Sequence, residues 1–133
     1  MTSTAISHRT HSSRRSLQGD LIFWSIAGAV VAALSGPLSA SWGLHRALLL
    51  DAGLAFAILG PLLLLGVNRM RPTRALFAGF VVTNFALAPL AWAAAAFGWL
   101  PLSSAGNMAL ADAGVVMLAL GVWQFTEMRH SHR

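Results

Sequence analysis

Two aspartates interrupt apolar stretches of this sequence and are its first candidates for chemistry. Asp51 lies within LLLDAGLAFAILG, and Asp112 lies within ADAGVVMLALG. A carboxyl group held inside a membrane helix is rare, and it commonly marks a proton or ion site. The alternative is structural, because the helix dipole stabilises a carboxylate near a helix N-terminus by about 0.3–1 kcal/mol. Asp51 and Asp112 are therefore predicted either to handle a proton or cation, or to fix the helix ends.

Two more polar residues could act together with these acids. Arg46 stands just before the stretch that holds Asp51, and it can pair with Asp112 across a helical bundle. Asn84 lies about ten residues into its own apolar stretch, near mid-membrane. A buried amide at that depth most often bonds a neighbouring helix, and a place in a substrate path is the alternative. The predicted ion or polar network consists of Asp51, Asp112, Asn84 and Arg46.

Other kinds of chemistry find little support in the residue types. The chain has no cysteine, which excludes disulfides and thiolate-ligated metals. All five histidines stand outside the apolar stretches, where they could not ligate a haem inside a bundle. No glycine-rich phosphate loop and no Ser–His–Asp set is present. We therefore expect no catalytic residue, no metal and no cofactor, and a protein that is not an enzyme.

The composition places these residues in a membrane. Of the 133 residues, 56% are hydrophobic and 10% are charged, whereas soluble domains have about 45–50% apolar and about 25% charged residues. A chain this short cannot bury such an apolar surplus within itself. A lipid bilayer is the expected partner. The net charge of +5 does not indicate nucleic acid, because the arginines are placed at the ends of apolar stretches.

Four stretches have the length of about 20 residues that a membrane-spanning helix needs. They are residues 21–40, 47–67, 75–97 and 105–125. The predicted fold is all-α: a polytopic membrane protein whose four transmembrane helices form an antiparallel bundle over residues 20–127. Residues 1–19 are expected to be a disordered cytoplasmic arm, and residues 128–133 a cytoplasmic tail.

The arginines predict the orientation of the bundle. With four spans, Arg46 is the one arginine of nine that falls on the opposite side from the others. The positive-inside rule then puts both termini in the cytoplasm, with the protein in a bacterial inner membrane and anionic lipid beside the arginines. Tryptophans near the span ends agree with this topology. The competing interpretation is a cleaved twin-arginine signal, with SRRSLQ at 13–18 and a cleavage site near LSAS at 38–41.

The two halves of the chain resemble each other. AGAVVAALSGPL at 27–38 matches AGFVVTNFALAPL at 78–90, and the DAG of the second stretch recurs in the fourth. This pattern predicts two tandem helical hairpins related by an axis along the membrane normal. Chance similarity between alanine-rich helices is the alternative.

Small residues form a stripe on the second and fourth helices. At 100° per residue, Gly53 and Gly60 lie on the side opposite Asp51, and Gly114 and Gly121 lie opposite Asp112. Such stripes allow helices to approach closely, so these four glycines are predicted helix-packing positions. If the acids face inward, the glycines face outward and could form a homodimer contact.

The chain resembles the small, uncharacterised four-helix inner-membrane proteins of bacteria. The resemblance lies in four short spans, an Arg71-Pro72 turn, and small or acidic residues at the start of the second and fourth helices. The resemblance implies no particular activity. The first functional hypothesis is a non-enzymatic structural or accessory membrane subunit, which binds a copy of itself or another membrane protein. The alternative is a small homo-oligomeric transporter or channel that uses Asp51 and Asp112. Small multidrug exporters need an acid within the first span, and Asp20 is expected only at its cytoplasmic edge.

Overall fold

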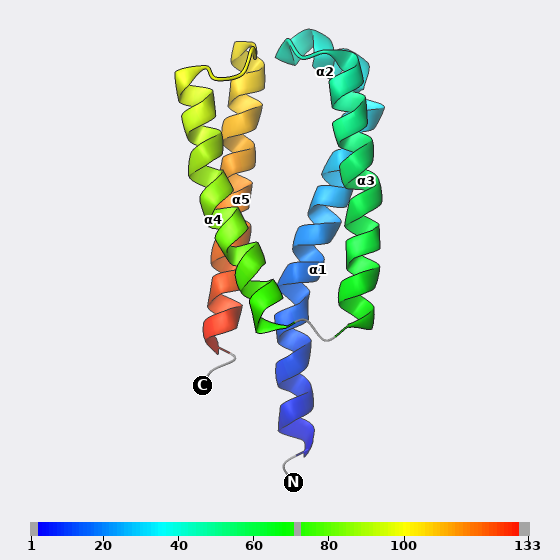
Figure 1. The fold of residues 1–133 in the computed structure, drawn as a ribbon, viewed down its shortest axis with the longest axis vertical. Helices are drawn as coiled ribbons and strands as arrows, with labels where there is room; N and C mark the ends of the chain where they lie inside the picture. Colours follow the sequence, from blue (N-terminus) through cyan, green and yellow to red (C-terminus); the bar gives the residue numbers. More distant parts are fainter. Residues whose placement is uncertain (1–2, 71–72, 131–133) are drawn as a thin grey trace.

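The computed structural model describes residues 3–70 and 73–130, with side chains from Arg14 onward, so the Arg71-Pro72 turn and residues 131–133 of the tail lie outside the described part. Helices make up nearly all of this part (Figure 1). They are α1 (Ser3–Ala33), α2 (Ser35–Trp42), α3 (Arg46–Arg69), α4 (Arg74–Phe97) and α5 (Ser104–His130). The predicted all-α class is confirmed.

Four of the helical segments are long and apolar enough to cross a membrane. They are Arg14–Ala33, Arg46–Arg69, Arg74–Phe97 and Ser104–His130. Their mean hydropathies are 1.4 to 2.3. At 1.5 Å per residue, three of these segments are longer than a hydrocarbon core of about 30 Å, and the first, with 20 residues, just reaches that length. The four segments identify a multi-pass membrane protein.

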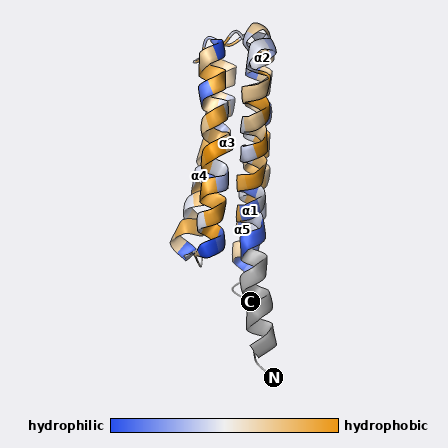
Figure 2. Cartoon of the chain, turned by 90° about the vertical axis from the view of Figure 1, so that its right-hand side faces the viewer, coloured by the Kyte–Doolittle hydropathy of each residue, from blue (hydrophilic) through white to orange (hydrophobic). Residues whose placement is uncertain are grey.

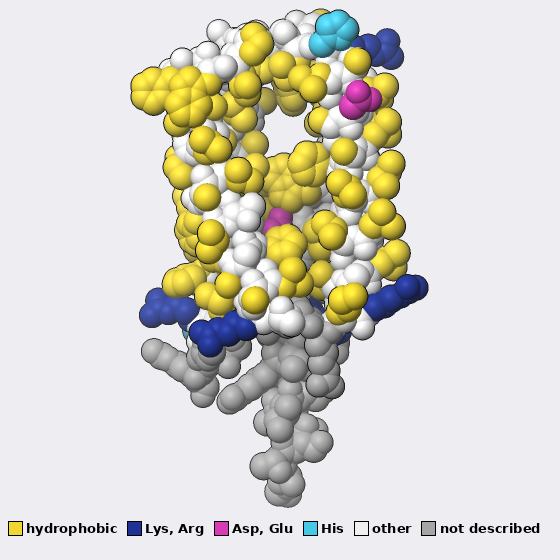
Figure 3. Space-filling view, in the orientation of Figure 1, with side chains coloured by type: hydrophobic (Ala, Val, Ile, Leu, Met, Phe, Trp, Pro, Cys, Tyr) yellow, Lys and Arg dark blue, Asp and Glu magenta, His cyan; other side chains and the backbone are white. Residues whose placement is uncertain are grey.

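The spans pack as two antiparallel hairpins. α1 lies along α3, and α4 lies along α5 (Figure 1). The hairpins meet mainly where α1 touches α5, at the end where α1 begins and α5 finishes. We call this the arginine-rich end, because Arg14, Arg69, Arg74 and Arg129 lie close to it in their helices, as the dark blue side chains of Figure 3 illustrate. The other end is called the far end.

The first span sits closer to the N-terminus than the sequence predicted. The apolar segment of α1 is Arg14–Ala33 rather than residues 21–40, and Ser35–Trp42 forms the separate helix α2. The break has a local cause: Pro37 has no N–H to donate to the carbonyl of Ala33, the last residue of α1. The helix also extends back to Ser3, through the segment expected to be a disordered arm.

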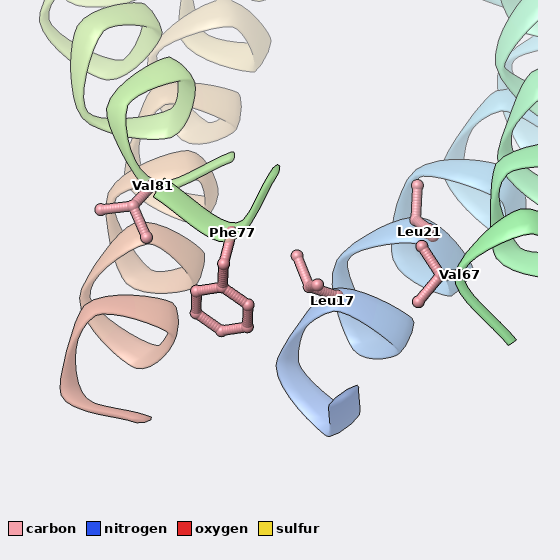
Figure 4. Close-up of a cluster of buried hydrophobic side chains, with 5 residues drawn as sticks. All are labelled: Leu17, Leu21, Val67, Phe77 and Val81. Carbon is pink, nitrogen blue, oxygen red and sulfur yellow. The ribbon is translucent and has the colours of Figure 1, made fainter. Parts of the chain in front are cut away.

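A hydrophobic core near the arginine-rich end holds the hairpins together. It contains Leu17 and Leu21 of α1, Val67 of α3, and Phe77 and Val81 of α4. Figure 4 shows Leu17 between Phe77 on one side and Val67 on the other, so residues of both hairpins share one cluster. Many large apolar side chains of the spans are exposed, as a lipid-facing surface requires. Figure 2 shows hydrophobic residues along the length of the helices.

The hairpins touch again at the far end. The Ser103 backbone N–H donates to the Trp42 carbonyl over 2.8 Å, and the Ser103 hydroxyl donates to the Ser41 carbonyl. Gly43 follows α2 with a φ of 76° and packs beside Ser103, in a left-handed conformation that a side chain would strain. Between the two contact regions the space-filling view shows an opening through the molecule (Figure 3).

Candidate functional site

Three polar side chains from three helices meet in the protein interior. Gln124 Nε2 donates to Asp20 Oδ2 over 2.6 Å, and Asn84 Nδ2 donates to the same oxygen over 3.0 Å. Asn84 Nδ2 also lies 3.1 Å from Gln124 Oε1, which accepts from it. Asp20 is 2% exposed, Gln124 0% and Asn84 6%. These residues form a closed network, which we call the polar triad.

The triad lies well inside the apolar zone. Asp20 comes six residues after Arg14, about 9 Å along α1, and Gln124 comes six residues before His130, about 9 Å along α5. Asp20 was expected at the edge of a span that begins at residue 21, whereas the candidate span Arg14–Ala33 contains it.

Small residues allow the three helices to come close enough for the triad to form. A Cβ at Gly121 would stand 3.3 Å from the Asn84 Cβ, which places α5 directly against α4. A Cβ at Gly19 would stand 2.9 Å from the Trp123 ring, which places α1 directly against α5. Asp20 directly follows Gly19 on α1, and Gln124 lies one turn after Gly121 on α5. Asp20 bonds the α1–α3 hairpin to Gln124 and Asn84 of the α4–α5 hairpin, while the bond from Asn84 to Gln124 lies within the second hairpin.

The triad does not satisfy every polar atom beside it. Asp20 Oδ1, Ser16 Oγ and Glu127 Oε2 are buried without a hydrogen-bond partner. Buried polar groups normally have such a partner, so unsatisfied oxygens call for an explanation. Both amide donors of the triad point at Asp20 Oδ2, which leaves Oδ1 as a bare carboxyl oxygen.

The four residues of the predicted polar network do not lie together in the structure. Asp51 and Asp112 are exposed, and they lie in the far-end half of α3 and α5, about 8 Å and 12 Å from the helix starts. Arg46 is exposed as well, and no ion pair joins it to Asp112. Asn84 alone among the four predicted network residues lies in the buried triad. The structure therefore does not bring Asp51 and Asp112 together with Asn84.

All four glycines of the predicted stripes are buried inside the hairpins rather than turned outward. A Cβ at Gly53 would meet backbone atoms of Ala32 and Gly28, and Gly60 packs on Ser25. In the other hairpin, Gly114 lies against Trp92, and Gly121 lies against Asn84. The glycines thus face the partner helix of their own hairpin, and they do not offer a surface for a second copy.

The glycine contacts also reveal a structural repeat with its own register. Gly53 packs on Gly28 and Ala32, whereas Gly114 packs on Ala88 and Trp92. Partner positions on α1 and α4 thus differ by 60 residues, and the matching glycines on α3 and α5 differ by 61. The sequence match between 27–38 and 78–90 has an offset of 51. The two hairpins therefore make equivalent glycine contacts. The residues of α1 and α4 that occupy equivalent places are not the ones that the sequence match aligns.

In the α4–α5 hairpin, the Trp92 side chain fills the space beside Gly114. Its indole Nε1 donates to the Ala111 carbonyl over 3.0 Å, and its ring covers Gly114. A deep tryptophan in a membrane helix needs such a partner for its N–H.

Sequence reasoning missed Asp20 and Gln124 as site residues. Gln124 carries a signal that could have found it, because it is an amide inside the apolar run GVWQF. Asp20 could be found only with the correct start of the first span. No family model, curated protein or solved structure matches this chain.

Proposed function

We propose that this protein is a non-enzymatic structural or accessory subunit of a bacterial inner membrane. One observation carries the proposal: the buried polar side chains of the triad bond to one another across the hairpins, while Asp51 and Asp112 lie exposed and apart from them. An arrangement of this kind supports fixed helix packing. Transport by Asp51 and Asp112 would instead need a polar path from these acids to Asn84.

The exposed apolar surface of the spans supports a lipid environment, and the described arginines support contact with anionic headgroups at their end of the bundle. A second copy or another membrane protein would bind on the outer helix faces, because the glycine stripes are already used within the hairpins.

A flux assay in proteoliposomes tests the proposal against transport. We expect wild-type protein to show no proton- or cation-coupled flux above that of empty liposomes, measured with an internal pH-sensitive dye and an imposed gradient. Asp51→Asn and Asp112→Asn should change folding yield little, within about 0.5 kcal/mol of stability, because both side chains are exposed. Flux that either substitution abolishes would overturn the structural role and establish the transport alternative.

The cytoplasmic position of the arginine-rich end is also part of this proposal, and it has a direct test. The chain contains no cysteine, so a single introduced cysteine is the only site for a maleimide. Thr73 and Leu100 are both exposed and lie at opposite ends of α4. With a membrane-impermeant maleimide on intact cells, we expect Leu100→Cys to react at once and Thr73→Cys to react only after permeabilisation. The reverse pattern would invert the topology.

A further inference from the structure

Three buried oxygens without a hydrogen-bond partner lie on α1 and α5, the two helices that the bond from Gln124 to Asp20 joins. They are Asp20 Oδ1, Ser16 Oγ and Glu127 Oε2. Asp20 and Ser16 are 2% and 0% exposed, and Glu127 is half-buried with this one oxygen enclosed. We call the three residues the α1–α5 seam. The oxygens include two carboxylates and no hydrogen-bond donor other than the serine hydroxyl.

The positions of the three residues in their helices bring them to one region. α1 and α5 run antiparallel and are bonded to each other through Asp20 and Gln124. Ser16 lies one turn before Asp20 on α1, and Glu127 lies one turn after Gln124 on α5. Both turns lead from the triad toward the arginine-rich end. Ser16 and Glu127 therefore stand at a similar level on the two contacting helices.

The described positive charges do not compensate these acids. Arg14 Nη2 donates to the Met70 carbonyl over 2.9 Å, and the Arg129 guanidinium lies over the Phe125 ring at 5.6 Å. The remaining charged or titratable side chains described on the helices packed at this end are exposed: Arg15, Arg69, Arg74 and His130. Within the described residues no ion pair reaches Asp20 or Glu127. An uncompensated carboxylate at this depth is strongly unfavourable.

We propose that the α1–α5 seam binds one sodium ion, with Asp20 Oδ1 as its main contact. The two amides of the triad hold Asp20 Oδ2 and so fix the direction of the bare oxygen. A sodium ion would be held by the carboxylate and hydroxyl oxygens, which are the ligands that hard cations prefer.

The cation should stabilise the folded protein, since it binds a site that unfolding destroys. The folding equilibrium constant should then rise up to tenfold for each tenfold rise in cation concentration above the dissociation constant. For sodium this means that stability rises with sodium chloride at constant ionic strength.

Thermal unfolding of the full-length protein in bicelles, followed by circular dichroism, tests the proposal. Sodium is varied against N-methylglucamine at fixed ionic strength and fixed pH. We expect the wild-type melting temperature to rise with sodium. Asp20→Asn should abolish that response, while Asp51→Asn, a matched change of an exposed acid, should retain it. Ser16→Ala should weaken that response, because it removes one of the oxygens that would hold the ion.

Several results would overturn the proposal. A wild-type melting temperature that does not change with sodium would do so, because a bound water alone gives no sodium dependence. A response that persists in Asp20→Asn would do so as well. If Asp20→Asn does not fold, Glu127→Gln is used instead. Loss of this carboxylate of the seam should reduce the response of the melting temperature. An unchanged response would overturn the proposed site. The outcome is independent of the flux assay, because a cation can be bound without being transported.

Discussion

Replacement of Gln124 by leucine is expected to lower the free energy of unfolding by about 1–3 kcal/mol. The substitution keeps a similar volume but removes the shortest bond of the triad, from Gln124 Nε2 to Asp20 Oδ2. It also removes the oxygen that accepts from Asn84. Asp20 would then remain buried with a single donor, and a polar group left unsatisfied in the core costs more than the bond itself contributes. Steric trapping or detergent-induced unfolding in mixed micelles measures the change.

Two further variants separate this effect from lost packing. Thr126→Val, an exposed site on the same helix, should change stability by no more than about 0.5 kcal/mol. The triple variant with leucine at positions 20, 84 and 124 should recover most of the lost stability, because an apolar replacement of a whole buried network is often neutral or better. If Gln124→Leu is as stable as wild type, the triad does not hold the hairpins together.

The fold could be predicted from the sequence because its main signals are long and redundant. Four apolar stretches near 20 residues leave few alternatives to a four-span bundle, and the structure confirms it. The ends of the membrane spans were predicted less accurately than their number. The window from Leu21 through Pro37 is apolar apart from Ser25 and Ser35. However, α1 ends at Ala33, and the candidate span begins at Arg14. A hydropathy pattern does not show where a backbone hydrogen bond is lost.

The candidate site depended on that boundary. With the first span starting at residue 21, Asp20 belongs to the interface, and attention falls on Asp51 and Asp112. Helical periodicity showed that the two aspartates lie on the side of the helix opposite the glycines. It did not show which of the two sides packs against protein. The glycines turned out to pack inside the hairpins, because backbone-to-backbone contact at Gly53 and Gly28 brings α1 and α3 together. The acids on the opposite side are consequently exposed.

The triad is a long-range feature that no local pattern contains. Asp20 and Gln124 are separated by 104 residues, and Asn84 stands 64 residues from Asp20. Asn84 was predicted to bond a neighbouring helix, and it bonds two. Identifying both partners requires the depth of each residue and the direction of its side chain, and both follow from the packing of α1 against α5.

The second large effect is expected at the close contact between α1 and α3. Alanine at Gly53 would place its Cβ 2.5 Å from the Ala32 nitrogen and 2.6 Å from the Gly28 oxygen. Both are backbone atoms of a helix, so no flexible side chain can move away. The helices must separate, and we expect Gly53→Ala to destabilise the protein by about 1–3 kcal/mol, as overpacking of a tight core does.

Gly66→Ala is the matched control on the same helix, because a Cβ at Gly66 meets nothing within 4 Å. Both substitutions gain the same helix propensity, roughly 0.5–1 kcal/mol, so Gly66→Ala should be neutral or stabilising, and the difference between the two variants isolates the contact. Unfolding by the same method as for Gln124→Leu measures it. Equal stability of the two variants would mean that α1 and α3 are not in backbone contact at Gly53, and that the geometric repeat of the two hairpins does not rest on their glycines.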